Sequence, residues 1–454
     1  MSTNKSYKTR EEILVKGREA IGIPFKQIDQ TNRLTTGKGA IGSVMEESWF
    51  GYNINNEANP DFSSAGVELK VTPYKSTRNG LRAKERLVCN IINYMEEYKT
   101  TFQTSSFWKK CNTMLLMFYE HKENLSKGDF TIDEVVLFSF PKEDFLIIEK
   151  DWEIIVGKIK NGKAHELSER DTLYLGACTK GATAASVRQQ PFSDISAKQR
   201  AFSLKESYMT YLLNKYILGN EADERIIKNP SLLKEQSFEE IIVSKISQHF
   251  GKTQQQLLAE FELKTSAKNV NELLLARMLG IKGRLSSTEE FQKANIILKT
   301  IRVNSDDSIT ESMSFPAFNF QKIVTENWED CDFKNMLEQM KFLFVIFRYN
   351  NINELIFDNI LFWNIPEPDL DEIRTVWERT VAILKQGVQL KTIGKRTYNN
   401  FPKSSENRVA HVRPHARNSQ DTLTLPDGRQ MPKQCFWLNN TYIREQLQKN
   451  FSPK

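Results

Sequence analysis

The stretch N-P-D-F-S-S-A-G-V-E-L-K-V-T, residues 59–72, joins a turn to a short strand and carries the pattern on which the fold assignment depends. Side chains alternate between the two faces of a strand, so the apolar side chains of Val67–Val71 are predicted to share one face. Glu68 and Lys70 then share the other face, and Asp61 precedes the strand in a turn rich in Pro, Asn and Ser. The stretch therefore predicts a strand with one buried face and one charged face.

A carboxylate pair and a lysine on such a strand suit metal-dependent hydrolysis of a phosphodiester. Two carboxylates can hold a divalent cation, while a lysine orients the attacking water and offsets charge on phosphorus. The pattern Pro60-Asp61 followed by Glu68-Leu69-Lys70 resembles the PD-(D/E)xK nuclease signature. On its own, the pattern favours the simpler interpretation, a strand whose polar face is solvated, so the rest of the chain has to decide.

The totals are compatible with an intracellular protein of two or three domains. The 454 residues are 39% hydrophobic and 11% aromatic, which supports sizeable cores, and the net charge of +6 fits an anionic partner such as nucleic acid. The five cysteines are scattered without a C-x-x-C pair, which predicts reduced thiols and no zinc site. No signal peptide is evident, and apolar runs such as Phe342–Phe347 are too short to span a bilayer. We therefore expect a cytoplasmic protein with no membrane partner.

Two other segments of the first half have a functional interpretation beside a structural one. Lys38–Glu46, K-G-A-I-G-S-V-M-E, is either a loop followed by a core helix or a phosphate-approaching backbone with Glu46 turned toward the sheet. Gly176–Lys205 is rich in small residues with Arg188, Gln190 and several lysines interspersed. Arg and Gln make bidentate contacts to base edges, and basic residues around them bind phosphates, but an ordinary basic surface loop explains the segment as well.

The three segments occur in one order that resembles the MutH family, which comprises mismatch-repair nicking endonucleases and related GATC-cutting restriction endonucleases. The matching patterns are K-G-x-x-G-x-x-x-E, D-F-x-x-x-G-V-E-L-K and V-R-x-x-P...A-F-x-L-K, and the resemblance covers roughly residues 9–212. It implies that Asp61, Glu68 and Lys70 are catalytic and that Glu46 supports metal binding. It also implies Mg²⁺ as cofactor, with Asp61, Glu68 and Glu46 as its ligands.

The same resemblance assigns DNA contacts. The residues implied are Lys38, Gly39, Arg188, Gln190, Ser203 and Lys205. Gln190 stands where MutH has a basic residue, and Ser203 stands where MutH has a tyrosine, so the base contacts of these two positions stay open.

The second half of the chain repeats the first. The segment at 9–15 returns at 237–243 (237 − 9 = 228), the segment at 38–46 returns at 268–276 (268 − 38 = 230), and the segment at 61–70 returns at 290–299 (290 − 61 = 229). The V-R-Q-Q-P segment is paired with Val412-Arg-Pro-His415. A thirteen-residue polar stretch, Gly219–Ser231, is expected to be the linker between the copies.

The second copy lacks the carboxylates of the first. Glu46 becomes Ala276, Glu68 becomes Ile297 and Asp61 becomes Glu290, whereas Lys70 keeps its type as Lys299. We expect this copy to be chemically inert. It is either a structural scaffold or a second DNA-binding, effector domain that uses His411, Arg413 and His415.

Together these inferences predict two tandem restriction-endonuclease-like α/β domains, each a mixed sheet flanked by helices. The predicted boundaries are 1–218 for the catalytic domain, 219–231 for the linker and 232–454 for the degenerate domain. The expected function is Mg²⁺-dependent double-strand cleavage of DNA at 5′-GATC-3′ by a type II restriction endonuclease. The alternatives are a MutH-type nicking endonuclease of mismatch repair and a non-catalytic DNA-binding protein.

The expected partner is double-stranded DNA. One active site cuts one strand of a palindrome, so two chains are expected to dimerise on DNA, or one chain to bind twice. A cognate methyltransferase acts on the same site but need not bind the enzyme.

Overall fold

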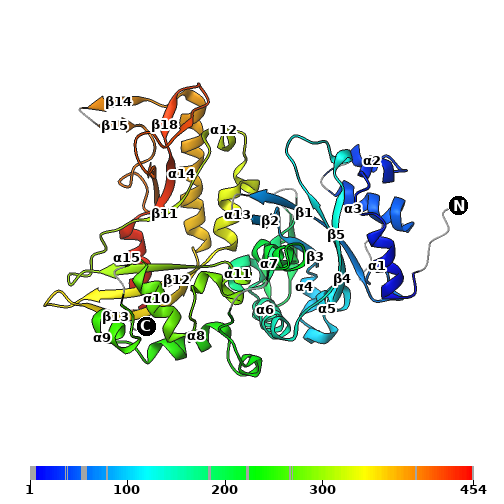
Figure 1. The fold of residues 1–454 in the computed structure, drawn as a ribbon, viewed down its shortest axis with the longest axis horizontal. Helices are drawn as coiled ribbons and strands as arrows, with labels where there is room; N and C mark the ends of the chain where they lie inside the picture. The colour runs from blue at the N-terminus through cyan, green and yellow to red at the C-terminus, as the bar shows by residue number, and fades with distance from the viewer. Residues whose placement is uncertain are drawn as a thin grey trace. The chain divides into compact units, whose positions relative to one another are not determined.

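The structure, a computed structural model, describes residues 7–35, 37, 39–52, 59–77, 80–181, 186–220, 224–264, 267, 269–393 and 396–451. The chain forms two compact units (Figure 1). The first comprises 1–242 and 280–296, and the second comprises 243–279 and 297–454. The two units thus interleave along the sequence.

The first unit contains most of the short helices of the chain. Its helices are α1 Arg10–Arg18, α2 Phe25–Ile28, η1 Arg33–Thr35, α3 Ala40–Val44, η2 Met45–Phe50, α4 Tyr94–Glu97, η3 Phe102–Thr104, α5 Ser106–Cys111, η4 Lys127–Asp129, α6 Lys142–Lys160, η5 Ala164–Glu166, η6 Glu169–Asp171, α7 Glu206–Tyr216, η7 Pro230–Lys234, η8 Leu285–Ser287 and α11 Glu289–Ala294. Its strands are β1 Glu68–Thr77, β2 Gly80–Ala83, β3 Leu87–Ile91, β4 Thr113–Glu120, β5 Ile132–Ser139, β6 Leu175–Thr179, β7 Val187–Gln190, β8 Ser193–Lys198 and β9 Arg200–Leu204. Helix α8, Phe238–Ser247, spans the sequence boundary between the units.

A mixed four-stranded sheet in the order β2-β1-β4-β5 organises the first unit. Strand β1 runs parallel to β4 and antiparallel to β2, and β4 runs antiparallel to β5. Residues 113–119 of β4 are all buried, as expected for a central strand covered on both faces. A hydrophobic cluster that includes Ile13, Phe25, Phe50 and Leu115 joins α1, α2 and η2 to this sheet. Strands β3-β9-β6 form a second, antiparallel sheet, and β7-β8 a hairpin.

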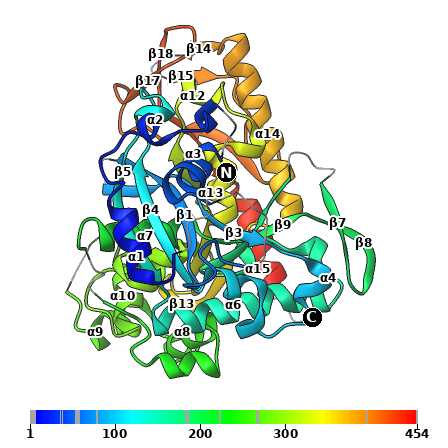
Figure 2. The same ribbon diagram turned by 90° about the vertical axis from the view of Figure 1, so that its right-hand side faces the viewer.

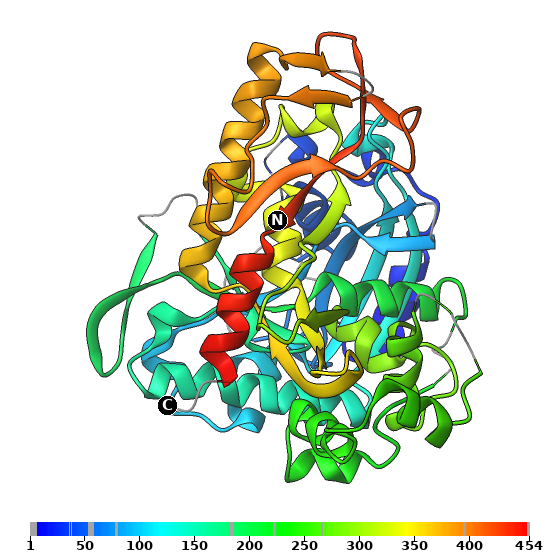
Figure 3. The ribbon, with the colours of Figure 1, turned by 90° about the vertical axis from the view of Figure 1, so that its left-hand side faces the viewer.

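The second unit is built from longer elements. Its helices are α9 Gln254–Glu260, α10 Val270–Met278, α12 Phe320–Ile323, η9 Trp328–Asp330, α13 Asp332–Gln339, α14 Glu367–Gln386 and α15 Asn440–Phe451. Its strands are β10 Ile296–Val303, β11 Met313–Ala317, β12 Lys341–Tyr349, β13 Leu355–Trp363, β14 Leu390–Ile393, β15 Arg396–Asn399, β16 Ala410–Pro414, β17 Thr422–Thr424, β18 Gln430–Pro432 and β19 Gln434–Leu438. Figure 3 shows α14 in orange and α15 in red.

The two units repeat one topology. The order β10-β12-β13 matches β1-β4-β5, and β11-β19-β16 matches β3-β9-β6. In both copies a capping box starts the first helix. Thr9 and Glu12 close it in the first copy, and Ser237 and Glu240 close it in the second. The predicted fold, two tandem mixed α/β domains of one type, is therefore confirmed.

One predicted pairing within the repeat is wrong. Strand β16 pairs with β19 from Ala410 to Pro414, in the same way that β6 pairs with β9 from Leu175 to Thr179. The segment around Val412 therefore corresponds to β6, and the counterpart of the β7-β8 hairpin is β17-β18. The Val-Arg dipeptide that suggested the match occurs in both segments. The place of a strand in a sheet is set instead by its partner strand, which here lies twenty or more residues further along the chain.

A buried aspartate–tyrosine pair recurs in both units and was missed in the sequence. The Tyr208 hydroxyl in α7 donates to Asp144 Oδ2 in α6 at 2.8 Å, and the Tyr442 hydroxyl in α15 donates to Asp369 Oδ2 in α14 at 2.7 Å. Both aspartates lie in the first turn of their helix, after Pro141 or Pro366. Each pair ties the long helix of a unit to the helix that follows its second sheet.

Helix α11 belongs to the first unit, although its sequence lies in the second copy. The Glu290 carboxylate accepts hydrogen bonds from Ile226 N at 3.0 Å and Ile227 N at 2.8 Å. The expectation that Glu290 replaces Asp61 is thus not supported, because its carboxylate is buried and binds backbone amides within the predicted linker. Residues 224–242 also fall within the first unit.

All five cysteines are free and buried, as the sequence predicts. Within the described ranges no helix combines the length and apolarity that crossing a bilayer requires. Ile21, which follows α1, is 42% exposed, because α1 ends at Arg18 and the chain then leaves the helical path.

Candidate active site

The turn before β1 brings Asp61 and Glu68 together. Phe62 and Val67 bridge each other across a tight loop, with Phe62 N donating to Val67 O at 2.9 Å, and Gly66 turns the loop with φ +63°. The Asp61 carboxylate accepts from Leu69 N at 2.9 Å, and the Glu68 carboxylate accepts from Asp61 N at 3.2 Å. These reciprocal bonds fix both carboxylates at the start of the strand.

Lys70 contacts Glu68 directly. Its Nζ donates to Glu68 Oε1 at 2.8 Å and to Cys89 O at 3.2 Å. An ammonium has three N–H groups, so one has no acceptor among the residues that the structure describes. Burial acts to lower the pKa of Lys70, but the Glu68 carboxylate more than compensates and the pKa is raised. Lys70 therefore stays protonated.

A second lysine, Lys110 at the end of α5, also reaches the site. Its Nζ lies 3.7 Å from Glu68 Oε1, and only 14% of its side chain is exposed. The sequence shows Lys110 just before strand β4, and the parallel register of Glu68 with Met114 explains its approach. Lys110 carried no predicted role, because no local sequence pattern shows that α5 ends beside β1.

Glu46 completes the carboxylate group from a different element. It lies in η2, a π-helical turn that continues α3 and ends at Gly51 in a left-handed conformation. Burial, followed by the charge of Asp61, raises the pKa of Glu46 to about 7, with a further contribution from Glu68 and a partial offset by Lys70. The three carboxylates predicted to act together thus share one electrostatic environment.

The donor set fits a hard divalent cation. Carboxylate oxygens are the ligands that such cations prefer. Burial, and after it neighbouring carboxylate charge, raise the pKa values of Glu46 and Glu68, so a cation placed among these groups would be favoured. Within the described residues, however, no three His, Cys, Asp or Glu side chains converge on one metal position as they stand. Glu68 is directed to Lys70, and Asp61 accepts from the backbone of Leu69.

The predicted DNA-contacting residues separate into exposed and buried groups. Lys38 lies outside the described residues, and Gly39 is exposed just before α3. Arg188 is exposed on β7, and among the described residues its side chain hydrogen-bonds only to its own neighbour's carbonyl, Val187 O at 3.3 Å. Arg188 is therefore placed as an external contact requires. Figure 2 shows the β7-β8 hairpin as a narrow two-stranded projection.

Gln190, Ser203 and Lys205 are buried, and their positions do not support direct DNA contacts. The Gln190 side chain accepts from Ala164 N at 2.7 Å and donates to Ile195 O, so it braces the hairpin. Ser203 is fully buried in β9. Lys205 is also fully buried, and its Nζ donates to Thr172 O at 2.5 Å. The resemblance to the MutH family implied DNA contacts at these three positions, but their side chains are buried in the interior of the protein.

The residues predicted to bind effector DNA also divide into buried and exposed ones. His411 is 5% exposed, and its Nδ1 lies 2.6 Å from Asn439 Oδ1, so it is a structural residue of β16. Arg413 and His415 are exposed. The Arg413 guanidinium lies 4.4 Å from the centroid of the Trp437 ring, and the His415 ring meets the same indole edge-on at 5.5 Å. Only these two of the three positions are open to a ligand.

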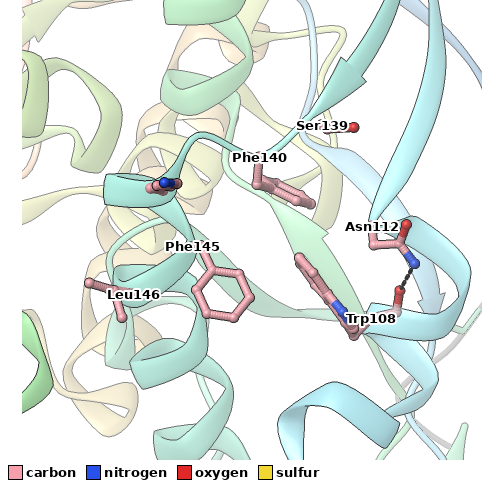
Figure 4. Close-up of a pocket in the computed structure, with 7 residues that line it drawn as sticks. Trp108, Asn112, Ser139, Phe140, Phe145 and Leu146 are labelled. Atoms are coloured by element: carbon pink, nitrogen blue, oxygen red, sulfur yellow. Dashed lines mark hydrogen bonds between the residues drawn. The ribbon is translucent and has the colours of Figure 1, made fainter.

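A separate pocket of about 430 Å³ lies in the first unit (Figure 4). Trp108, Phe140 and Phe145 form its aromatic wall, and the Asn112 amide beside them donates to Trp108 O at 2.8 Å. None of the three site carboxylates lines it, so it is distinct from the candidate active site.

Comparison with known proteins shows what the chain is similar to. The family model described as "DNA mismatch repair enzyme MutH" matches residues 50–151 and 279–375, and 279 follows 50 by 229 residues, in agreement with the repeat. The type II restriction enzyme Sau3AI of Staphylococcus aureus is 38% identical over 98% of this chain and 99% of its own length. The DNA mismatch repair protein MutH of Shewanella baltica is 26% identical over 45% of this chain, and that of Shigella flexneri is 25% identical over 46%; each is covered over 94% of its length.

Proposed function

This chain belongs to the family of type II restriction enzymes that share the MutH nuclease domain, and from that premise we propose that it cuts both strands of DNA at 5′-GATC-3′ with Mg²⁺. The observation that carries the proposal is the contact of Lys70 with Glu68 beside Asp61, on one strand end. The GATC site is supported by the resemblance of the ordered motifs to GATC-cutting members. The second unit would bind DNA without cutting it.

The roles of the site residues follow from their geometry. A divalent cation held by Asp61 and Glu68, with Glu46 beside them, would neutralise phosphate charge and acidify a bound water. Lys70 is protonated and holds one N–H free of partners among the described residues, so it would donate to the phosphate oxygen on which negative charge develops. Lys110 keeps the charge of Glu68 balanced. Lys70 would therefore serve as an electrostatic stabiliser.

Arg188 and the β7-β8 hairpin would supply contacts to the DNA. The hairpin presents Val187, Phe192 and Ile195 as exposed apolar side chains beside the exposed Arg188. Basic and apolar side chains on one projection suit insertion into a groove, where Arg binds base edges and apolar groups contact thymine methyls or base steps. Because one active site serves one strand, two chains would meet on the palindrome, or one chain would bind two sites.

Digestion of a plasmid with several GATC sites tests the proposal, with Mg²⁺ at low salt. Wild type is expected to give discrete double-strand cuts at GATC, and Glu68→Ala and Lys70→Met to give none. Lys299→Met provides the matched control, because Lys299 is the counterpart of Lys70 in a copy with Ile297 at the carboxylate position. Nicks alone would support the mismatch-repair alternative. Binding of GATC sites without any cleavage by wild type would refute the enzyme assignment.

A further inference from the structure

Tyr52 presents a buried hydroxyl that has no hydrogen-bond partner among the described residues. It follows η2 and Gly51, and its ring packs edge-on against Phe62 with centroids 5.4 Å apart. An unpaired buried hydroxyl destabilises the folded state, so native structures rarely keep one without a reason. The position of this hydroxyl suggests the reason.

Tyr52 is placed beside the carboxylates of the candidate active site, because its backbone N donates to Glu46 O at 3.1 Å and its ring packs against Phe62, the residue after Asp61. After burial, the charges of Asp61, Glu46 and Glu68, in that order, raise the pKa of Tyr52. None of these carboxylates is a hydrogen-bond partner of the phenol, so the hydroxyl stands near them without touching them. A single water in this gap would accept the phenol O–H and donate its own two hydrogens to carboxylate oxygens.

We propose that Tyr52 is a positioning residue of the nuclease site, whose hydroxyl orients a water molecule between the phenol and the carboxylates of Glu46 and Asp61. This inference rests on the proposed function, because the oriented water belongs to the hydrolytic reaction. The phenol, as a proton donor, fixes one lone pair of the water. The remaining lone pair is then directed away from Tyr52, toward a cation or toward phosphorus.

Tyr7 provides a matched control within the same aromatic cluster. Its ring also packs edge-on against Phe62, with centroids 5.4 Å apart, but its hydroxyl donates to Phe50 O at 3.2 Å. The two tyrosines thus share a ring neighbour and differ in whether the hydroxyl is satisfied by the protein. Replacing each with phenylalanine removes only the hydroxyl.

The experiment compares Tyr52→Phe and Tyr7→Phe in the full chain. For Tyr52→Phe we expect a single-turnover cleavage rate about tenfold lower, since one hydrogen bond in the site is lost. Its Kd for GATC duplex in Ca²⁺ should equal that of wild type. Its Tm without divalent ions should be no lower than that of wild type, and the rise in Tm with Mg²⁺ should be smaller. Tyr7→Phe should show the reverse, with unchanged cleavage and a lower Tm.

The outcomes separate the two proposals. If wild type cuts GATC and Tyr52→Phe cuts at the same rate, or if Tyr52→Phe loses stability without divalent ions as Tyr7→Phe does, the role of Tyr52 is refuted while the proposed function stands. If wild type cleaves no DNA, both proposals fall. The ion-free Tm is independent of activity, so it identifies a merely structural hydroxyl in either case.

Discussion

Burial distinguishes side chains of the same type in this protein. Arg188 is exposed on β7, whereas Lys205 is fully buried, two residues after the buried Ser203. Both basic residues belong to the segment 176–205, whose composition suits either DNA binding or an ordinary basic surface loop. Because their surroundings differ, we expect replacement of Arg188 to change DNA affinity and replacement of Lys205 to change stability.

Arg188→Ala should weaken binding to GATC duplex by about 1–3 kcal/mol, or roughly 5- to 150-fold, with little change in Tm. Lys205→Met should instead lower the free energy of unfolding by about 1–3 kcal/mol, because it leaves the buried Thr172 carbonyl without its donor. Fluorescence anisotropy and urea denaturation measure the two effects. Equal losses of affinity with no loss of stability would show that Lys205 contacts DNA after all.

His411 makes the stability of the second unit depend on pH. Burial lowers its pKa despite the hydrogen bond with Asn439. An unfolded histidine titrates near 6.5, so below that pH the unfolded state binds more protons than the folded state. The stability that the neutral His411 contributes to the folded state is complete above about pH 6.5, and it is lost as the pH falls from there through the folded pKa. His411→Gln should therefore reduce the loss of Tm between pH 7.5 and pH 5.5, and an identical loss in both proteins would contradict this assignment.

At the scale of elements, hydrogen bonds of one buried side chain hold the β7-β8 hairpin in place, and the backbone of its turn is strained. Gln190 holds it to Ala164 N and Ile195 O. A two-residue turn, Pro191-Phe192, closes it, and Phe192 takes a left-handed conformation with φ +63° that favours glycine. Phe192 is nevertheless 69% exposed. The strained and exposed Phe192 is therefore the side chain of this hairpin that we propose contacts the DNA.

Phe192→Gly should leave the free energy of unfolding within about 1 kcal/mol of wild type. Relief of the left-handed strain, about 1 kcal/mol, is offset by loss of the edge-on contact with Tyr98. Affinity for GATC duplex should nevertheless fall about tenfold or more, because the apolar tip is lost. Anisotropy titrations at fixed salt measure the affinity, since salt alone changes it strongly. Unchanged affinity would remove the hairpin tip from the DNA interface.

At the scale of the whole molecule, the two sequence copies do not coincide with the two compact units. Lys293 of α11 is 2% exposed within the first unit. Its Nζ binds Asp144 Oδ1 at 2.6 Å and also pairs with Glu289, and it lies 4.6 Å from the centroid of the Tyr211 ring. The first unit therefore depends on a segment encoded in the second copy.

Lys293→Met should lower the free energy of unfolding by about 3–5 kcal/mol, because Asp144 and Glu289 remain buried without their cation. Lys299→Met is the control, since burial lowers the pKa of Lys299 and no carboxylate among the described residues compensates. Its replacement should be neutral or stabilising. Urea denaturation of the full chain compares the two, and a smaller loss for Lys293→Met than for Lys299→Met would contradict the assignment.

The sequence alone determined the features that depend on neighbours along the chain. The capping boxes at Thr9 and Ser237 and the near-constant offset of the repeat arise from short-range geometry or from direct comparison of residues. The exposed charged face expected for residues 67–71 is not found, because Glu68 is buried and Val71 is only half-buried. The ordered motifs likewise brought Asp61, Glu68 and Lys70 into one hypothesis, because they lie within ten residues of each other. Their spacing on one strand end required no knowledge of the rest of the fold.

Only the tertiary structure decided which distant residues meet. It placed Lys110 beside Glu68, buried Gln190 and Lys205, paired β16 with β19 and assigned α11 to the first unit. It also left the Tyr52 hydroxyl unpaired beside the carboxylates. Each of these outcomes depends on packing and strand pairing between segments far apart in sequence. The type of a side chain limits what it can bind, and its burial determines whether a ligand can reach it.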